Sequence, residues 1–207
     1  MKLSAFIAFL LFSFWASAQT FSEKTTTASN VRLNVSNSGT FGNAFRGYRD
    51  GSGNPSGEYP AGSGVEHLFE SGIWFGGLIN GSTVAVSTAA VDAPQGYSTG
   101  SAGFEFYPEP GATLKEISSL RNSPYYNTLA VSHQDFVATF SDKNVKVPGT
   151  NTQIGSHLDP LFVKVTAKSY NWNYSFSDFF VILDYELENI GANTIDSAFF
   201  GLWANTV

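Results

Sequence analysis

The chain of 207 residues contains no cysteine. It therefore has no disulfide, no thiolate nucleophile and no Cys-ligated zinc or iron–sulfur site. Basic residues are also few, with 11 Lys and Arg against 17 Asp and Glu and a formal net charge of −6. Because a clustered basic surface is what binds phosphate, this balance argues against a nucleic-acid partner and against a polybasic membrane patch.

Charged residues of both signs make up only 14% of the sequence, whereas hydrophobic residues make up 43%. This composition is the opposite of that of a disordered chain, so we expect a folded domain. No apolar run after the first eighteen residues has the length of a membrane-spanning helix, and we therefore expect no membrane span in the mature chain. Aromatic residues, by contrast, are plentiful at 15% of the sequence.

The first eighteen residues have the pattern of a secretory signal peptide. Lys2 gives a short positive start, residues 5–16 are almost entirely apolar, and Ala16-Ser17-Ala18 supplies the small residues before a cleavage site. Twelve residues at ~1.5 Å each span only ~18 Å, which is too short for a membrane anchor. The pattern predicts cleavage before Gln19, export through the secretion machinery, and a location outside the cell or on its outer surface.

Most of the mature chain has the residue patterns of strands. Residues 31–35, 163–168 and 181–188 alternate between apolar and polar side chains. Such alternation gives each strand one buried face and one solvent-exposed face, which is typical of strands in an antiparallel sandwich. Asn80-Gly81 lies between two apolar runs and predicts a type I′ hairpin turn. After a turn at 189–193, a further strand is expected at 194–204.

We therefore expect an all-β antiparallel sandwich over residues 31–207, preceded by a Ser- and Thr-rich linker at 19–30. Residues 37–64 contain eight Gly and two Pro and predict a long Gly-rich surface loop. Because an apolar run stands close to residue 207, we interpret the chain as the front part of a longer polypeptide.

One or two short helices are also expected. Thr113 and Glu116 have the spacing of a capping box, which predicts a helix over residues 113–121. A second helix is expected after Ser132, where Phe136 and Phe140 are four residues apart.

The strings HLFESGIWFGGLINGSTVAVSTA and DFFVILDYELENIGANTIDSAFFGLWA, the second preceded by KSYNWNYSFSD, resemble the N-terminal modules of large secreted surface proteins of Bacteroidota. The resemblance covers residues 31–207 and implies a cell-surface or extracellular β-sandwich. Proteins of that group commonly use the type IX secretion system and carry a C-terminal sorting domain, which is not recognisable within these 207 residues. The shared motifs are hairpin and strand signatures, so the resemblance implies no catalytic residues.

The heptad at residues 170–176 alternates four aromatic with three small polar residues. In an extended chain the four rings share one face. Facing inward they are core, which we favour because monomers rarely expose such a patch without a ligand. Facing outward they form a platform on which sugar rings stack. The platform rings are Tyr170, Trp172 and Tyr174, and the adjacent amides that would bind sugar hydroxyls are Asn171 and Asn173.

Two further patterns place candidate ligands for a metal ion. Asp50, Ser52 and Asn54 carry side-chain oxygens at alternate positions, which is the spacing of a calcium loop. Pro55 and Ala61, however, stand where an EF-hand has Gly and Glu. We therefore favour a turn cluster and no cofactor, with calcium as the alternative.

The other pattern is Ser-His-x-Asp, which occurs twice. Residues i and i+2 of an extended chain share a face, so His133 with Asp135, and His157 with Asp159, offer two ligands each. The same residues also form ordinary turns and helix caps, and such a structural role is the interpretation we favour. A single metal site would need the two loops to meet.

No motif names a reaction. The one G-x-S-x-G match, residues 96–100, lacks the strand before it and the helix after it that a serine-hydrolase elbow requires. We expect an exported structural or interaction module without catalytic activity, with other surface proteins or a polysaccharide as partners. A carbohydrate-binding module is the first alternative, and a secreted hydrolase is the second.

Overall fold

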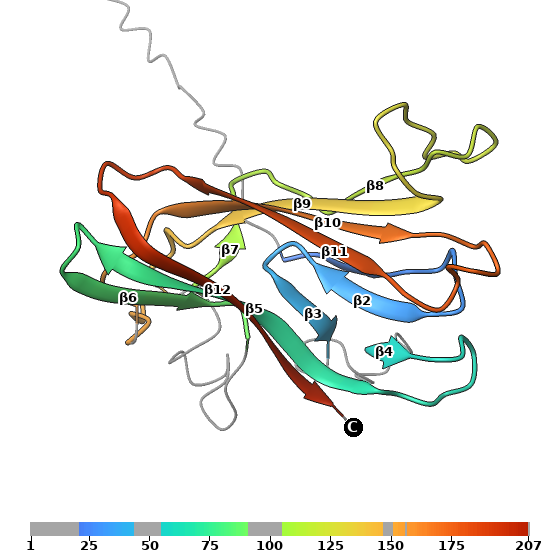
Figure 1. Ribbon diagram of the computed structural model, residues 1–207, viewed down its shortest axis with the longest axis horizontal. Helices are drawn as coiled ribbons and strands as arrows, with labels where there is room; N and C mark the ends of the chain where they lie inside the picture. The colour runs from blue at the N-terminus through green and yellow to red at the C-terminus, as the bar shows by residue number, and fades with distance from the viewer. Residues whose placement is uncertain (1–20, 44–54, 91–104, 147–150, 156, 207) are drawn as a thin grey trace, which may run out of the picture.

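The computed structural model describes residues 21–43, 55–90, 105–146, 151–155 and 157–206, which form two antiparallel sheets and, within these ranges, no helix (Figure 1). The first sheet contains β1 (Glu23–Thr25), β2 (Arg32–Ser36), β3 (Thr40–Asn43), β4 (Gly57–Glu58), β5 (Leu68–Ile79), β6 (Thr83–Thr88) and β12 (Ile195–Thr206). The second contains β7 (Tyr107–Pro108), β8 (Lys115–Ile117), β9 (Gln134–Ser141), β10 (Val163–Asn171) and β11 (Ile182–Asn189). The expected all-β antiparallel architecture is confirmed.

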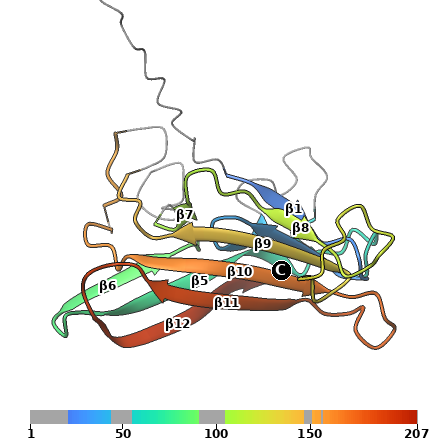
Figure 2. The same cartoon turned by 90° about the horizontal axis from the view of Figure 1, so that it is seen from above.

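Strand β5 organises the first sheet. One of its edges pairs with β12 over almost its full length, and the other pairs first with β3 and then with β6. In the second sheet the order is β11-β10-β9, and β7 and β8 pair with different parts of β9. Strands β11 and β12 thus end their sheets, and they lie beside each other on one side of the molecule (Figures 1 and 2).

The core lies between the two sheets. Ile73 and Phe75 reach it from β5, and Phe140, Val163 and Val165 reach it from the second sheet. The ring of Phe106 meets that of Phe140 edge-on, with the centroids 5.7 Å apart. Burying each large apolar side chain contributes roughly 1.5–3 kcal/mol, so this layer holds the sheets together without disulfides.

Alternation located most of the strands correctly. Residues 31–35 lie largely in β2, 163–168 in β10 and 181–188 in β11. The hairpin between β5 and β6 is also confirmed, because Asn80 and Gly81 have the positive φ values, 50° and 69°, that a type I′ turn requires.

The helix predicted over residues 113–121 is wrong. Residues 115–117 form β8, which pairs with β9, and Leu114 lies in the core. Glu116 does not cap a helix: its carboxylate accepts a hydrogen bond from Gln134 (2.8 Å) and pairs with Lys24 (3.0 Å). Partners distant in sequence therefore override the local capping signal.

The second predicted helix is also wrong, because the residues after Ser132 form β9. Phe136, Ala138 and Phe140 are all buried, at every second position. A spacing of four places two side chains on one face of either a helix or a strand. Ala138, midway between the two rings, is the residue that distinguishes the two structures.

Two segments expected to be irregular are partly regular. The predicted loop at 37–64 contains β3 and β4, and β3 pairs with both β2 and β5. The predicted linker at 19–30 contains β1, which pairs with β2. Short polar side chains make this order possible, since the hydroxyl of Ser36 accepts hydrogen bonds from the backbone N–H groups of Ser38 and Thr40 (3.2 and 3.1 Å).

The strand expected at 194–204 is β12. It does not pair with β11 but crosses to the first sheet, where Phe200 lies opposite Phe75 of β5. The connection between β11 and β12 therefore links the two sheets. The ring of Tyr185 in β11 contacts the ring of Phe200 in β12, with the centroids 5.5 Å apart.

Candidate functional site

Exposed aromatic side chains gather where β10 ends and the chain turns toward β11, at the right of Figure 1. Tyr174 is 48% exposed and Phe176 is 73% exposed. Their rings are nearly parallel, with centroids 5.3 Å apart and an interplanar angle of 9°. The ring of His133 meets Tyr174 edge-on at 4.6 Å. We call His133, Tyr174 and Phe176 the aromatic stack.

The backbone fixes the aromatic stack in place. Nδ1 of His133 accepts a hydrogen bond from the backbone N–H of Asn173 (3.1 Å), which joins the start of β9 to the loop after β10. Beside it, the hydroxyl of Ser132 accepts a hydrogen bond from the backbone N–H of Asn171 (2.8 Å) and donates to the carboxylate of Asp135. The residues of the stack thus lie in loops at the ends of two adjacent strands of one sheet, and these hydrogen bonds hold the two loops together.

The segment Ser132-His133-Gln134-Asp135 is not a turn as a whole: Ser132 and His133 form a bend, and Gln134 and Asp135 begin β9. The carboxylate of Asp135 is buried and accepts hydrogen bonds from the backbone N–H groups of Val131 (2.7 Å) and Ser132 (2.8 Å). These hydrogen bonds hold the bend that contains His133, whose ring contacts Tyr174.

The heptad does not present four rings on one face, because β10 ends at Asn171. Tyr170 and Trp172 are half-buried, with ring centroids 6.2 Å apart. The phenol of Tyr170 donates to the carboxylate of Asp184 (3.2 Å), and partial burial together with this hydrogen bond raises its pKa. Only Tyr174 and Phe176 of the four aromatic residues stand well into solvent.

The two amides of the heptad also differ. Asn171 is fully buried and its side chain donates to the hydroxyl of Ser29 (2.7 Å), so its predicted position beside a ligand is wrong. Asn173 is exposed next to the aromatic stack, as is Ser175. These two residues are the polar side chains closest in sequence to the exposed rings.

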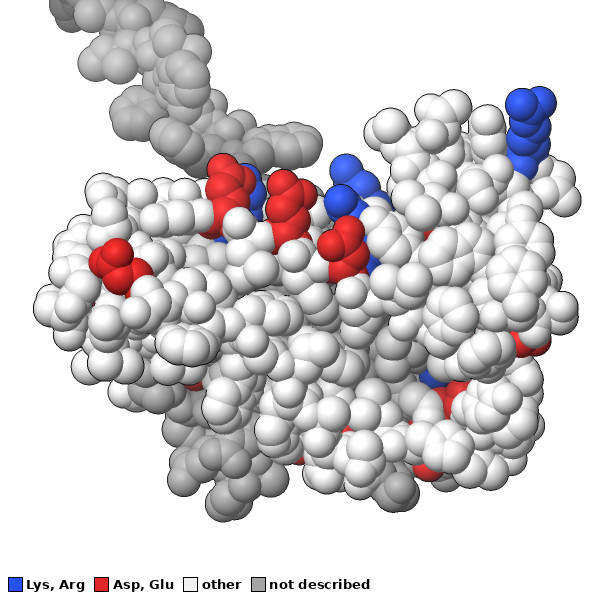
Figure 3. All heavy atoms as spheres, in the orientation of Figure 1, with Lys and Arg blue, Asp and Glu red and all other residues white. Residues whose placement is uncertain are grey.

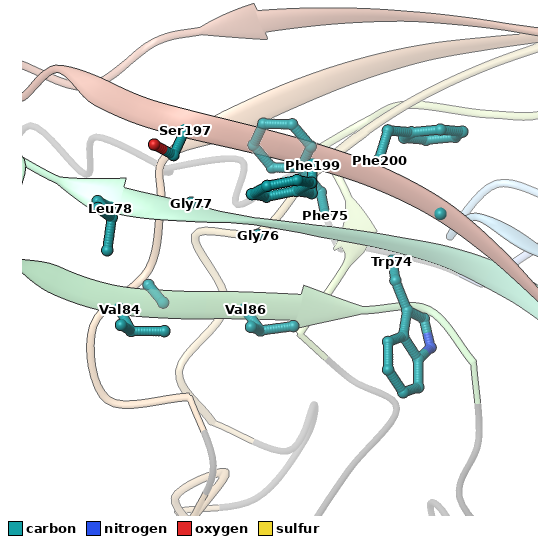
Figure 4. Close-up of a pocket in the computed structure, with 12 residues that line it drawn as sticks. Trp74, Phe75, Gly76, Gly77, Leu78, Val84, Val86, Ser197, Phe199 and Phe200 are labelled. Carbon is teal, nitrogen blue, oxygen red and sulfur yellow. The ribbon is translucent and has the colours of Figure 1, made fainter.

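A second exposed apolar surface lies on the outer face of the first sheet, where the structure has a hollow of about 450 Å³ (Figure 4). Ile73 and Phe75 face the core, so the alternate residues of β5 face outward. We call this surface the β12 groove. Its outward-facing lining residues are Trp74, Gly76, Leu78, Val84, Val86, Phe199 and Gly201.

No protein-family model, curated protein or solved structure matches this chain.

The two Ser-His-x-Asp segments do not meet. His133 precedes β9, whereas the imidazole of His157 donates to the backbone oxygen of Asp142, just beyond the other end of that strand (2.6 Å). At ~3.4 Å per residue, these ends are on the order of 30 Å apart. His157 is buried and Asp159 is exposed, so the second pair does not converge either.

Among the described residues, no group of three or more His, Asp or Glu side chains is placed to hold a metal ion. The predicted calcium ligands Asp50, Ser52 and Asn54 lie outside the described residues, as does the G-x-S-x-G match at 96–100. The same described part of the chain contains no helix with the length and apolarity needed to cross a membrane.

Ser87, Asp142 and His157 are the three residue types of a hydrolase triad, and all are buried near one another. Their hydrogen bonds differ from those of a triad, in which the His must contact the Ser hydroxyl. Here Ser87 donates to the Asp142 carboxylate (2.7 Å) and His157 contacts only the backbone of Asp142. The carboxylate also accepts from the backbone N–H groups of Leu161 (2.8 Å) and Val163 (2.7 Å), so the cluster joins the two sheets.

Charged side chains are distributed unevenly. On the face shown in Figure 3 they gather along the upper margin, and most of the surface below is uncharged. One ion pair on the second sheet joins Lys164 to Glu188. Neither the aromatic stack nor the outward side chains of the β12 groove include a Lys, Arg, Asp or Glu.

Proposed function

We propose that the protein is a non-catalytic binding module of the cell exterior, with the aromatic stack as its ligand-binding surface. The observation that carries this proposal is the exposure of Phe176, which is 73% accessible while its ring is held parallel to Tyr174. A large ring fixed in solvent by a hydrogen-bonded support costs hydrophobic free energy unless a ligand covers it.

Carbohydrate is the ligand class that this surface fits best. Sugar rings pack their C–H faces on flat aromatic faces and need neighbouring polar groups for their hydroxyls. Phe176 offers the ring face, and the exposed Asn173 and Ser175 offer an amide and a hydroxyl nearby. The surface lacks the Lys or Arg that recognition of a strongly anionic ligand would require.

The sequence of the first eighteen residues supports export, and the two-layer architecture is compatible with a β-sandwich module of a surface protein. The hydrolase alternative finds no support in the described residues, because His133 contacts a backbone N–H and His157 a backbone oxygen. A general base would instead lie within reach of a nucleophile or a water held by a second acid.

Phe176→Ala is expected to abolish carbohydrate binding and leave folding unchanged. The ring is mostly exposed, so its removal should alter the free energy of unfolding by about 0.5 kcal/mol or less. Retardation in native gels containing xylan, mannan, β-glucan or starch measures binding. We expect the wild-type protein to be retarded by at least one of these polymers, and Phe176→Ala to migrate as in a gel without polymer.

Val84→Ala is the matched control, because Val84 is 74% exposed but lies on β6, away from the aromatic stack. It should retain wild-type retardation. Equal loss of binding in both variants, or full binding by Phe176→Ala, would exclude the stack as the site. If none of the polymers retards the wild type, the ligand is not a carbohydrate of these classes.

A further inference from the structure

Strand β12 has an unpaired outer edge. One edge pairs with β5 from Ile195 to Thr206, and no strand in the described part of the chain pairs with the other. Natural edge strands are usually short or protected by Lys, Pro or inward-pointing charge. Over its twelve residues β12 has no Lys and no Pro, and Asp196 is its only charged residue. Bulges interrupt it only toward its two ends, between Asp196 and Phe199 and between Asn205 and Thr206, so residues 199–205 are the regular part of the edge. An edge of this kind is a template for another strand.

The side chains beside this edge are apolar on both faces of the sheet. Phe199 is 74% exposed on the outer face, where Trp74 is 45% exposed. On the inner face Phe200 is 42% exposed and Leu202 is 57% exposed, although Leu202 lies opposite the fully buried Ile73. The apolar inner face of the first sheet thus continues as far as the outer edge of β12, where its side chains are exposed to solvent.

Gly201 is not explained by the fold of one chain. A Cβ atom built on it would meet only the Cβ of Trp74, at 4.0 Å, and its φ is not in the left-handed region. Glycine weakens a strand interior and is typical of a place where another group approaches closely. Gly201 is paired with Trp74 of β5, and its missing side chain leaves a depression in the outer face beside the Trp74 ring.

The same strand supplies the side chain that fits this depression. Phe199 and Gly201 are two residues apart and face the same side of the sheet. In an antiparallel pair of β12 strands centred on Phe200, Phe199 of each copy lies opposite Gly201 of the other. A ring packed over a cross-strand glycine is a stabilising pair in β-sheets.

We propose that β12 pairs antiparallel with β12 of a second copy, centred on Phe200, so that the first sheets of two molecules become one continuous sheet. The contact is isologous, which is the arrangement of a twofold symmetric dimer. It covers Phe199, Phe200, Leu202 and part of Trp74, which expose on the order of 400 Å² together given rings of ~150–250 Å². The backbone of residues 199–205 adds to this area, bringing the contact toward the ~800 Å² per partner that stable interfaces bury.

Charge does not oppose this pairing. Asp196 lies beyond the bulge between Asp196 and Phe199, so the extra residue places it opposite Trp203 of the other copy rather than opposite a second carboxylate. The side chains within two residues of the centre are all uncharged. The acidic net charge of the protein is carried elsewhere.

Single cysteines test the register, because the chain contains none of its own. Phe200→Cys places two Cys opposite each other with Cα atoms about 4.5–5.5 Å apart, within the range of a disulfide. We expect complete cross-linking into a dimer under mild oxidation. Leu202→Cys is the matched control on the same strand and face, and its two copies are about 14 Å apart, so it should not cross-link.

Sedimentation equilibrium of the full chain tests the association itself. We expect a reversible monomer–dimer equilibrium, and Gly201→Val should weaken it at least about tenfold because the added side chain fills the depression. The open space around Gly201 and the strand preference of Val keep the variant folded. Val84→Ala, on β6 at the far side of β5, should leave the equilibrium unchanged.

Four results would overturn the proposal: a wild-type protein that stays monomeric at millimolar concentration, cross-linking of Leu202→Cys in place of Phe200→Cys, open-ended oligomers instead of dimers, or an unchanged dimer in Gly201→Val. Binding of a synthetic β12 peptide by a strictly monomeric protein would also contradict it, since the edge would then accept a strand without forming the symmetric dimer.

Discussion

Asp142→Ala is expected to lower the free energy of unfolding by about 3–5 kcal/mol. The carboxylate is fully buried and accepts hydrogen bonds from the Ser87 hydroxyl and from the backbone N–H groups of Leu161 and Val163. Removing it leaves all three donors buried without a partner, and each such donor costs roughly 1–3 kcal/mol. Urea unfolding measures the change as a shift of the midpoint at constant slope.

Asp184→Ala is the control for loss of a carboxylate in general. Asp184 is exposed on β11 and accepts one hydrogen bond, from the phenol of Tyr170. Its removal should change the free energy of unfolding by about 0.5 kcal/mol, as is usual for exposed positions. A loss below about 1 kcal/mol in Asp142→Ala would contradict the role assigned to this carboxylate in joining the two sheets.

Gly72→Ala is expected to cost about 3 kcal/mol, although it adds only one methyl group. A Cβ at this position in β5 would lie 2.5 Å from the backbone nitrogen of Ala90 and 2.7 Å from the carbonyl carbon of Ala89. Both obstructing atoms belong to the backbone, so they cannot move aside as a flexible side chain would. The melting temperature should fall by roughly 6–12 °C for a chain of this size, which calorimetry measures.

Gly201→Ala is the matched control, because Gly201 lies on the neighbouring strand β12 and has open space above it. Alanine loses less backbone entropy on folding than glycine, so the variant should be neutral or more stable by about 0.5 kcal/mol. Both variants are compared with the wild type at a protein concentration low enough to keep all three monomeric, since association shifts apparent stability. Equal melting temperatures for the two variants would show that the backbone of Ala89 and Ala90 does not restrict β5.

How well the sequence predicted each element depended on where its partners lie. The hairpin at Asn80-Gly81 and the strand alternation in β10 are local patterns, and the structure confirms both. β8 depends on β9, Gln134 and Lys24, none of which is visible in the residues around Glu116. The partner of β12 is β5, more than one hundred residues earlier, and no local rule predicts that pairing.

The candidate site was foreseen in the same partial way. The aromatic heptad identified Tyr174, but Phe176, which belongs to the same heptad, was not among the predicted platform rings. Period-two alternation assumed that the strand continued past Asn171, where it ends. The packing of His133 against Tyr174 depends on the pairing of β9 with β10, which no local spacing of residues in the sequence indicates. The outward apolar residues of β5 and β6 could have been noticed, because Trp74, Leu78 and Val86 make both faces of those strands apolar.

The crossing of β12 to β5 also constrains the order of folding. Strand β5 lacks a partner on one edge until residues 195–206 arrive, so its pairing must wait for a segment far along the chain. Contacts of such sequence separation slow folding, because the loop must close before the contact forms. In the meantime the full length of β5 is available to other chains. A polypeptide that emerges slowly from a ribosome or an export channel therefore remains vulnerable to aggregation until its last described strand is in place.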